Sequence, residues 1–312
     1  MPVMKSKILE LFRSTPDIVS GEALSAALGI SRVSVWKHIQ KLQECGYEIE
    51  SGPRGYQLRM SPDTPFPWEF PKREVWMHYF PEVSSTMDIA RDMARKGAPH
   101  FSVVVAGRQT RGRGRMRRNW HSHDGGLYFT LILRPDIPLQ WCSRVNFAAS
   151  LVLCRVIRKQ TGIHAAVKWP NDLLVDGKKL SGMLSEMEAV AEMVSFITIG
   201  IGINVNNDPT TDEPGACSLL QLLEKPVSRK EILALFLDEL QAYLDGSDAN
   251  LEKVVSDWKE YTCTLGRHVS VITHQETSTG LALDIDPTGA LILKMTDGSL
   301  KKVIYGDCMN ND

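Results

Sequence analysis

Apolar residues near the start of the chain recur at helical spacing and predict three short helices. The first spans the apolar cluster at residues 8–12. Ser20 is placed to cap a second helix that stops at Gly29, and Ser31 to cap a third that ends before Gly46. Serine hydroxyls accept hydrogen bonds from the free N–H groups of a first helical turn, and glycine is favoured where a helix ends. This order predicts a small helical domain.

The third predicted helix has an apolar stripe and a basic opposite face. Val35, Ile39 and Leu42 fall at i, i+4 and i+7, so they form one buried stripe. An alternating segment and a turn with Arg54 follow, which predicts a hairpin wing. This order is typical of a winged helix-turn-helix that binds DNA, and a helical hairpin that binds only protein is the alternative. The residues expected to contact DNA are Ser31, Arg32, Ser34, Lys37, His38 and Arg54.

Residues 61–71 contain four prolines and interrupt the regular pattern. Proline fixes φ and lacks a backbone N–H, so a stretch rich in it is extended. We predict an extended linker here.

The middle of the chain mixes apolar runs of strand length with helical stripes. The runs lie at residues 101–106, 127–133 and 196–206, and the stripes at residues 145–156 and 232–244. This mixture predicts a globular middle domain that contains both strands and helices. Residues 263–308 instead show short strands separated by turn residues, which predicts a small all-β barrel of about five strands.

Ser84, Ser85 and Thr86 precede an amphipathic helix that closes at Gly97. Hydroxyl groups at this place usually cap the helix. The same geometry also directs hydroxyls and N–H groups toward a polar ligand, so this segment alone leaves both interpretations open.

The composition is that of an ordinary globular protein. The chain has 312 residues, 43% hydrophobic and 23% charged, with a formal net charge of −1, so any nucleic-acid contact must come from a local basic patch. No apolar run approaches the about 20 residues of a membrane span, and the N-terminus lacks the apolar core of a signal peptide. The six cysteines show no Cys-x-x-Cys spacing, which predicts neither a zinc site nor disulfides. We expect a cytoplasmic protein with no membrane partner.

The densest chemistry lies in residues 107–120, GRQTRGRGRMRRNW, between two predicted strands. This arginine loop holds six arginines within eleven residues, with Gly112 and Gly114 among them. Guanidinium groups hold carboxylate and phosphate oxygens in fork geometry, and glycine lets the backbone approach a ligand. Basic runs are often solvated surface or bind nucleic acid through its phosphates, but this one lies inside a globular domain. The arginine loop therefore predicts a site that binds two anions close together.

A second polar cluster surrounds a hairpin predicted at residues 167–187. Pro170 prevents a continuous central strand, and Asp176-Gly177 is typical of a type I′ turn. Surface ion pairs are the simplest interpretation of the lysines and carboxylates there. Pairing with the strands beside the arginine loop would bring these groups to the same site. The crowded residues are Lys168, Asn171, Asp172 and Lys179. Residues 121–124, HSHD, lack further ligands at suitable spacing, so we predict no structural metal there.

Together these motifs resemble the bifunctional biotin–protein ligase and biotin operon repressor family over nearly the whole chain. The family's GRGRxGRxW loop appears as GRGRMRRNW, its KWPND as residues 168–172 and its K-L-x-G as residues 179–182. The resemblance implies an α+β multidomain fold. Its parts are a winged helix-turn-helix at residues 1–62, a class II aminoacyl-tRNA-synthetase-like catalytic domain at 63–262 and a C-terminal SH3-like β-barrel at 263–312.

The resemblance also implies a two-step reaction. The carboxylate of biotin attacks the α-phosphate of Mg-ATP to give biotinyl-5′-AMP and pyrophosphate, and a lysine of a biotin carboxyl carrier protein then attacks this mixed anhydride. The carrier would belong to acetyl-CoA carboxylase or a similar carboxylase. The catalytic residues implied are Arg113, Arg115 and Lys168. Those implied to bind biotin are Ser85, Thr86, Met87, Gln109, Arg113, Gly114, Arg115, Lys179 and Gly182. Those implied to bind ATP or the adenylate are Arg115, Arg118, Trp120, Lys168, Asn171, Asp172 and Asn204, with Asn171 and Asp172 as candidates near Mg.

The chain departs from the family pattern at three places. Arg117 stands where the family usually has glycine, Met87 replaces a more usual asparagine, and the C-terminal segment lacks an arginine often found there. The last departure weakens the expectation that the barrel helps to bind ATP.

Three alternatives remain beside a ligase that represses transcription. A lipoate–protein ligase-like enzyme would share the catalytic fold, but the GRGR motif and the DNA-binding domain argue against it. A biotin-sensing transcription factor without ligase turnover is disfavoured by Lys168 and the paired arginines. A ligase whose helix-turn-helix no longer represses also fits the sequence. The resemblance implies a homodimer on a palindromic operator, with biotinyl-5′-AMP as corepressor.

Overall fold

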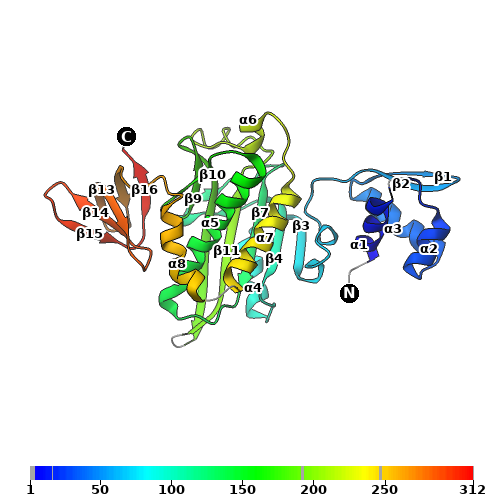
Figure 1. Ribbon diagram of the computed structural model, residues 1–312, viewed down its shortest axis with the longest axis horizontal. Helices are drawn as coiled ribbons and strands as arrows, with labels where there is room; N and C mark the ends of the chain where they lie inside the picture. The colour runs from blue at the N-terminus through cyan, green and yellow to red at the C-terminus, as the bar shows by residue number, and fades with distance from the viewer. Residues whose placement is uncertain (1–3, 16, 191–192, 246–247, 312) are drawn as a thin grey trace. The chain divides into compact units, whose positions relative to one another are not determined.

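The chain forms two compact units, Met1–Tyr79 and Phe80–Asp312 (Figure 1). The computed structural model describes residues 4–15, 17–190, 193–245 and 248–311. Within these ranges no helix is long and apolar enough to cross a lipid bilayer. The domain boundaries at residues 62 and 262 stay predictions, and the first compact unit extends further, to Tyr79.

The first unit is a winged helix-turn-helix, as predicted. Its elements are α1 (Met4–Ser14), α2 (Gly21–Leu28), α3 (Arg32–Glu44) and the antiparallel wing of β1 (Glu48–Gly52) and β2 (Gly55–Met60). Both predicted caps are confirmed. Ser20 Oγ accepts a hydrogen bond from Ala23 N at 3.0 Å, which fixes the start of α2. Ser31 Oγ accepts one from Ser34 N at 3.2 Å, which fixes the start of α3.

Residues 61–71 are not the extended linker that their prolines predict. Phe66 and Trp68 pack against the core of the first unit. The segment contains the 3-10 helix η1 (Pro67–Glu69), and η2 (Glu74–Trp76) follows it. Trp68 Nε1 donates to the hydroxyl of Tyr47 at 2.9 Å, which fixes the docked ring. The prediction was wrong because the aromatic rings between the prolines bury enough apolar area to hold the segment in place.

The second unit is built on a seven-stranded sheet with the order β3-β4-β7-β11-β10-β9-β8. The strands are β3 (Met77–Val83), β4 (Ser102–Gln109), β7 (Leu127–Leu133), β8 (Ala166–Lys168), β9 (Asp172–Val175), β10 (Lys178–Val190) and β11 (Met193–Ile203). The helices are α4 (Thr86–Arg95), α5 (Cys142–Thr161), α6 (Leu219–Leu223), α7 (Arg229–Asp245), α8 (Asp248–Lys259) and the 3-10 turn η4 (Leu139–Trp141). The stripes predicted at residues 145–156 and 232–244 lie in α5 and α7.

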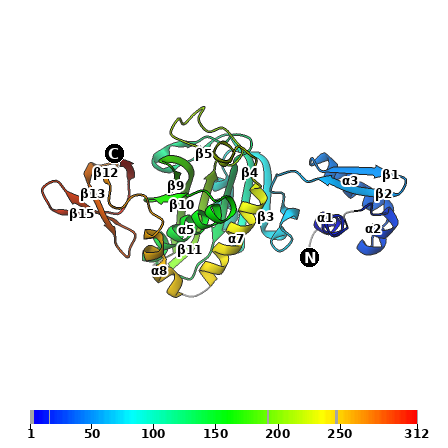
Figure 2. The same cartoon turned by 45° about the horizontal axis from the view of Figure 1, so that its top comes forward.

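Alternation along the strands gives this sheet two different faces. Phe129 of β7 packs edge-to-face on Phe236 of α7, with ring centroids 5.5 Å apart. Phe129 pairs in register with Ile201 of β11. Phe196 of the same strand packs with Ala90 of α4, and an odd number of positions separates it from Ile201, so it points to the other face. α4 and α7 therefore cover opposite faces, and Figures 1 and 2 show α5, α7 and α8 together over one of them.

The turn between β9 and β10 is the predicted type I′ turn. Asp176 and Gly177 have φ angles of 49° and 79°, and this turn needs positive φ at both positions. It returns β10 against β9, so that Lys179 pairs with Leu174.

The C-terminal part of the second unit is a five-stranded antiparallel sheet with the order β15-β14-β13-β12-β16. Its strands are β12 (His268–Ile272), β13 (Thr277–Ile285), β14 (Leu291–Met295), β15 (Leu300–Val303) and β16 (Asp307–Asn310). The buried Trp169 ties this part to the central sheet. Its backbone N donates to Thr264 Oγ1 at 2.9 Å, and its indole Nε1 donates to Gly289 O at 3.0 Å. The C-terminal sheet is thus joined to the KWPND segment.

Candidate active site and DNA-binding face

A pocket lies on the face of the central sheet that α4 covers. It encloses about 1060 Å³ of empty space, part of it open to solvent. Of the residues predicted to form the site, Ser85 and Lys168 do not line it. Those that do are Thr86, Met87, Gln109, Arg113, Gly114, Arg115, Arg118, Trp120, Asn171, Asp172, Lys179, Gly182 and Asn204.

Three glycines form the floor of the pocket. Gly182 on β10 pairs in register with Gly202 on β11, and Gly200 lies two positions away on the same face. A Cβ added at Gly202 would lie 2.3 Å from Trp120 Cε2, and one at Gly182 would lie 3.0 Å from Trp120 Cζ3. A Cβ at Gly200 would lie 2.7 Å from Met87 Sδ. The strand backbone is therefore open to close approach by a flat group.

The sequence prediction included Gly182 but missed Gly200 and Gly202. Their Gly-x-Gly spacing in an apolar strand is the signal that could have found them. Strand geometry places such a pair on one face, where a missing Cβ leaves room for a ligand.

Gln109, the last residue of β4, fixes the start of α4. Its Oε1 accepts hydrogen bonds from Thr86 N at 2.8 Å and Thr86 Oγ1 at 3.1 Å, and its Nε2 donates to Ser122 Oγ at 3.1 Å. Ser85 stands at the N-cap but makes no side-chain cap bond. Its Oγ is buried without a hydrogen-bond partner. Capping is therefore not its role, and its hydroxyl is enclosed by protein and does not line the pocket.

The arginine loop folds into a short hairpin beside the pocket. Its elements are β5 (Gly112–Arg113), η3 (Arg115–Arg117) and β6 (Asn119–Trp120). Gly114 N donates to Arg118 O at 2.8 Å and closes the hairpin. Met116 and Arg117 have φ angles of 52° and 59°, a region that favours glycine because it has no Cβ. Arg117 thus adopts a backbone conformation that glycine adopts more readily, which explains why the family usually has glycine at this position.

Two of the loop arginines that line the pocket pair with carboxylates from other elements. Arg113 Nη1 donates to Asp88 Oδ1 of α4 at 2.8 Å, and its Nη2 pairs with Glu186 of β10. Arg118 pairs with Asp307 of β16. The sequence prediction missed all three carboxylates because they lie far along the chain from the loop and belong to no motif.

Arg115 is held by uncharged oxygen atoms. Its Nη1 donates to Asn171 Oδ1 at 3.0 Å and its Nη2 to Gly306 O at 3.1 Å. Asn171 is held in turn, because its Nδ2 donates to Met183 O. Burial lowers the pKa of Arg115 from its usual value, but a guanidinium keeps its charge at any ordinary pH. The side chain therefore places a fixed positive charge at the pocket wall.

The two predicted lysines differ in their surroundings. Lys179 Nζ lies 2.8 Å from Asp172 Oδ2 and 5.7 Å from the centroid of a Trp120 ring. Lys168 is the last residue of β8 and stands opposite Asp172 in register. Both lysines are thus neighbours of Asp172, but only Lys179 lines the pocket.

His121 and His123 connect the arginine loop to the segment that follows β11. His123 Nε2 pairs with Asp212, and His121 Nδ1 lies 3.6 Å from Asp212 Oδ2. Both histidines line the pocket together with Glu213. Among the described residues no group of three or more His, Cys, Asp and Glu side chains could hold a metal ion.

The predicted DNA-binding residues do not all lie on the outer face of α3. His38 is half-buried, and its Nδ1 is enclosed without a partner. Burial, together with Lys41 and Lys5, lowers the pKa of His38. The sequence prediction placed His38 on the outer face. The structure corrects this. His38 lies four residues before the buried Leu42, so both side chains lie on the same side of α3 and His38 is turned toward the core. Ser34 is also half-buried, whereas the exposed members of the set are Ser31, Arg32, Lys37 and Arg54.

The fold and the pocket together define a class of protein. A winged helix-turn-helix precedes a catalytic sheet whose arginine-rich hairpin borders an anion-binding pocket, and a small β-sheet follows. This is an acid-activating ligase joined to a DNA-binding domain.

Comparison with known proteins identifies the family. Residues 79–204 match the model of the biotin/lipoate A/B protein ligase family, residues 5–57 match an HTH domain, and residues 264–309 match the biotin protein ligase C-terminal domain. The bifunctional ligase/repressor BirA of Bacillus subtilis is 37% identical, over 97% of this chain and 98% of that protein. Its counterpart in Escherichia coli is 28% identical, over 92% and 91%. The chain belongs to the biotin–protein ligase family, in its bifunctional ligase/repressor form.

A solved structure supports the same assignment. The biotin protein ligase from Aquifex aeolicus in complex with biotin and ATP aligns with 75% of this chain and 98% of that chain, at a TM-score of 0.63 and 26% identity. The predicted fold class, the ligase activity and the use of biotin and ATP are therefore confirmed, as is the DNA-binding helix-turn-helix.

Proposed function

We propose that this pocket activates biotin with ATP and transfers it to a lysine of a carrier protein, and that the first unit represses transcription when the adenylate is bound. The observation that carries the proposal is the convergence of Gln109, Arg115 and Lys179 on one pocket from three separate elements. A carboxylate that approaches a polyphosphate is repelled. A site that joins the two must therefore hold fixed positive charge at the reacting atoms.

The residue roles follow from the two steps. In the first step a carboxylate oxygen of biotin bonds to the α-phosphorus of ATP, and the bond to the bridging oxygen breaks and releases pyrophosphate. We assign Arg113, Arg115 and Lys168 to the phosphates and the developing charge, and Lys179 to the biotin side. In the second step the lysine amine of the carrier attacks the acyl carbon, AMP leaves and the amine loses a proton. The arginine loop shields the mixed anhydride from water.

The pocket fits the shape and polarity of biotin. Biotin has a compact bicyclic ring with a polar urea edge, and an apolar side chain that ends in a carboxylate. Because Gly200 and Gly202 have no Cβ, the ring can lie against their backbone once Met87 and the Trp120 indole, which cover them in the structure, move aside. The predicted contact of Ser85 with biotin stays a prediction, because its hydroxyl is buried and does not line the pocket. Trp120 supplies an apolar wall. Its predicted contact with the adenylate stays a prediction, because in the structure its indole lies on the glycine floor.

The oxygen atoms near Asn171 do not form a resident magnesium site. Mg²⁺ prefers several oxygen ligands in octahedral geometry. Asn171 Oδ1 accepts a hydrogen bond from Arg115, and Asp172 pairs with Lys179. We infer that Mg²⁺ arrives with the phosphates of ATP as part of the substrate.

The partners and the switch belong to the same proposal. We assign as acceptor the biotin carboxyl carrier protein of acetyl-CoA carboxylase or of a similar carboxylase. The proposed regulation is a homodimer, formed when biotinyl-5′-AMP orders the pocket loops, that binds a palindromic operator. A chain that acts on carrier proteins and chromosomal DNA would work in the cytoplasm.

The first test is ATP-dependent transfer to a purified biotin carrier domain, read by intact mass, with lipoate offered in parallel. We expect the mass of the carrier to rise by one biotin and not by lipoate. Transfer of lipoate would instead favour the lipoate ligase alternative. Failure to transfer either acid, with the adenylate still bound, would make the protein a sensor without turnover.

The switch has its own test. Sedimentation and operator binding should both respond to biotinyl-5′-AMP, with tighter dimerisation and tighter binding together. Unchanged dimerisation and operator affinity in the presence of the adenylate would overturn the proposed corepressor role and leave the ligase assignment intact.

A further inference from the structure

The outer face of α3 carries two exposed apolar side chains. Val33 is 62% exposed and Trp36 is 47% exposed. With Lys37 and Gln40 they stand at i, i+3, i+4 and i+7, so the four side chains share one face of the helix. This face, which we call the reading face, points away from the buried stripe of α3. A valine and an indole exposed side by side indicate a partner that covers them.

The charge around the reading face indicates which partner that is. Arg32, Lys37 and Lys41 on α3 and Arg54 in the wing are all exposed. Four cations around a small apolar pair complement a polyanion. Duplex DNA offers phosphates for the cations, and in its major groove it also offers methyl groups for the apolar pair.

We propose that Val33 and Trp36 read thymine by packing on its C5-methyl group in the major groove, and that Gln40 reads a neighbouring adenine. The proposal rests on the DNA-binding function of the first unit. Thymine presents a methyl group and one acceptor in the major groove, and adenine presents a donor and an acceptor that an amide side chain can bind with two hydrogen bonds. The operator half-site therefore contains A·T pairs where the reading face touches it.

The reading face adds sequence information that basic contacts cannot supply. Lysines and arginines that contact phosphates position a protein on DNA without distinguishing one sequence from another. The residues predicted from the sequence to contact DNA are all polar or charged. Val33 and Trp36 escaped that prediction because apolar residues in a helix pattern suggest burial, and only the structure shows that they are exposed.

Removing single methyl groups from the DNA tests this reading directly. The full chain, with biotin and ATP present, is first used to select its preferred duplexes from a random library. Each thymine of the selected half-site is then replaced by deoxyuridine, which removes only the C5-methyl. We expect affinity to fall about fourfold at one or two positions per half-site, the effect of exposing one methyl-sized group, and to stay unchanged at the others.

Variants of the reading face must abolish that difference. Val33→Ala and Trp36→Ala should bind the thymine and deoxyuridine duplexes with nearly equal affinity, and Trp36→Phe should keep part of the difference. Val75→Ala and Trp76→Ala are matched controls, because these side chains are 58% and 39% exposed and lie in η2, outside the helix-turn-helix. Both controls should keep the wild-type dependence on the methyl group. Biotin transfer should be unchanged in all five variants.

The outcomes separate this proposal from the DNA-binding function itself. Strong selection of a duplex with no loss on any deoxyuridine substitution would overturn the thymine reading and leave DNA binding intact. The thymine reading would also be overturned if Val33→Ala and Trp36→Ala kept the full methyl dependence, or if they weakened all duplexes equally. If no duplex were selected or bound, both the reading and the DNA-binding function would fall.

Discussion

Among the loop arginines that line the pocket, Arg115 differs from Arg113 and Arg118 in the charge of its partners. Arg113 and Arg118 pair with carboxylates, whereas Arg115 donates to the amide oxygen of Asn171 and the carbonyl oxygen of Gly306. A guanidinium paired with a carboxylate must give up that partner to bind a substrate anion. Among the loop arginines that line the pocket, Arg115 is the one whose charge is not neutralised by a paired carboxylate, so it is the most available to a phosphate.

Replacing Arg115 with alanine should therefore damage the first step most. For Arg115→Ala we expect adenylate synthesis to fall about 100- to 1000-fold, as when a fixed electrostatic donor is removed, and any adenylate formed to escape faster. Pyrophosphate release and the adenylate that co-elutes with the protein measure the two effects. Arg117→Ala is the control, since Arg117 is exposed and does not line the pocket. Wild-type turnover and retention in Arg115→Ala would exclude the assigned role.

Gly202 is the floor position where a side chain is least tolerable. An added Cβ would lie 2.3 Å from Cε2 of the rigid indole of Trp120, whereas at Gly200 it would meet the flexible end of Met87. We expect Gly202→Ala to lower biotin affinity at least about tenfold and Gly200→Ala to lower it less, because a flexible thioether can move aside. Titration calorimetry with biotin measures both.

A double variant identifies the cause of the loss at Gly202. If the added methyl acts by displacing the indole, Gly202→Ala combined with Trp120→Ala should lose little more biotin affinity than Trp120→Ala alone. Wild-type affinity in Gly202→Ala would show that the floor does not approach the ligand.

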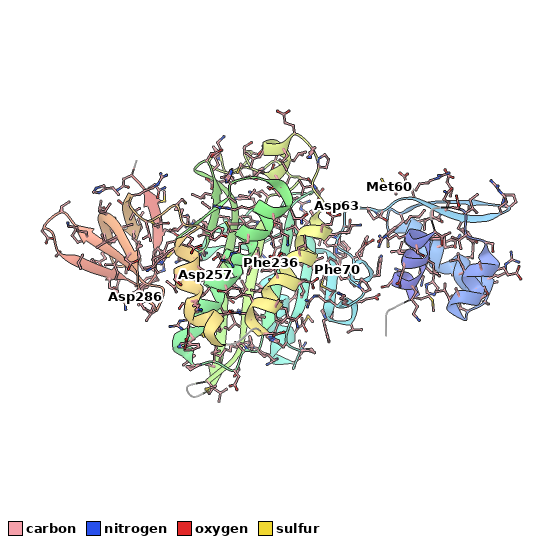
Figure 3. The ribbon with its side chains drawn as sticks, viewed as in Figure 1. Met60, Asp63, Phe70, Phe236, Asp257 and Asp286 are labelled. Atoms are coloured by element: carbon pink, nitrogen blue, oxygen red, sulfur yellow. The ribbon has the colours of Figure 1, made fainter. Side chains whose placement is uncertain are left out.

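At the scale of elements, the β13–β14 turn has a measurable dependence on pH. Asp286, labelled in Figure 3, accepts hydrogen bonds from Thr288 N at 2.8 Å, Thr288 Oγ1 at 2.6 Å and Ala290 N at 3.0 Å, and its carboxylate pairs with Lys302. Burial by itself would raise the pKa of Asp286. The hydrogen bonds outweigh it and lower the pKa from 3.8 to about 2.

The second unit should therefore lose stability at acid pH through this turn. A carboxyl group whose pKa is lower in the folded state stabilises the fold above its unfolded pKa, and this contribution disappears as pH falls from about 4 to about 2. We expect Asp286→Asn to remove roughly 2 kcal/mol of that pH dependence. Denaturant unfolding at a series of pH values measures it. Asp297→Asn, in the exposed β14–β15 turn, is the control and should change the slope less. An unchanged pH profile in Asp286→Asn would contradict the prediction.

Features predicted correctly from the sequence are those that depend on neighbouring residues. The Asp176-Gly177 turn and the Ser31 cap each depend on a few consecutive positions, and both are confirmed. The arginine loop and the KWPND segment were recognised as motifs in the same way. Features that failed depend on contacts from elsewhere in the chain. The packing of Phe66 on the first unit and the pairing of Arg118 with Asp307 could not be predicted from local sequence.

At the scale of the whole chain, the C-terminal sheet is part of the catalytic unit. Asp307 and Gly306 hold Arg118 and Arg115, and Gly289 O accepts the indole N–H of Trp169. The missing C-terminal arginine weakened the expectation that this sheet supports ATP binding. The C-terminal sheet can nevertheless support ATP binding, because Asp307 and Gly306 hold Arg118 and Arg115 in position.

Two fragments test this division of the chain. A fragment that begins at Met77 keeps β3 and all of the second unit, so we expect it to synthesise adenylate and biotinylate a carrier domain at near wild-type rates without binding DNA.

A fragment that ends at residue 262 lacks the C-terminal sheet. Its arginine loop loses the partners at Asp307 and Gly306, so it should make adenylate at least about tenfold more slowly, as expected when a catalytic cation is no longer held in position. Circular dichroism shows whether each fragment folds. Asp307→Ala in the full chain removes the partner of Arg118 without deleting the sheet, so it tests the same contact even if the shortened fragment does not fold. Its control is Glu276→Ala, because Glu276 pairs with Lys301 on the same sheet. Wild-type adenylate synthesis by the shortened fragment and by Asp307→Ala would show that the arginines are positioned without the C-terminal sheet.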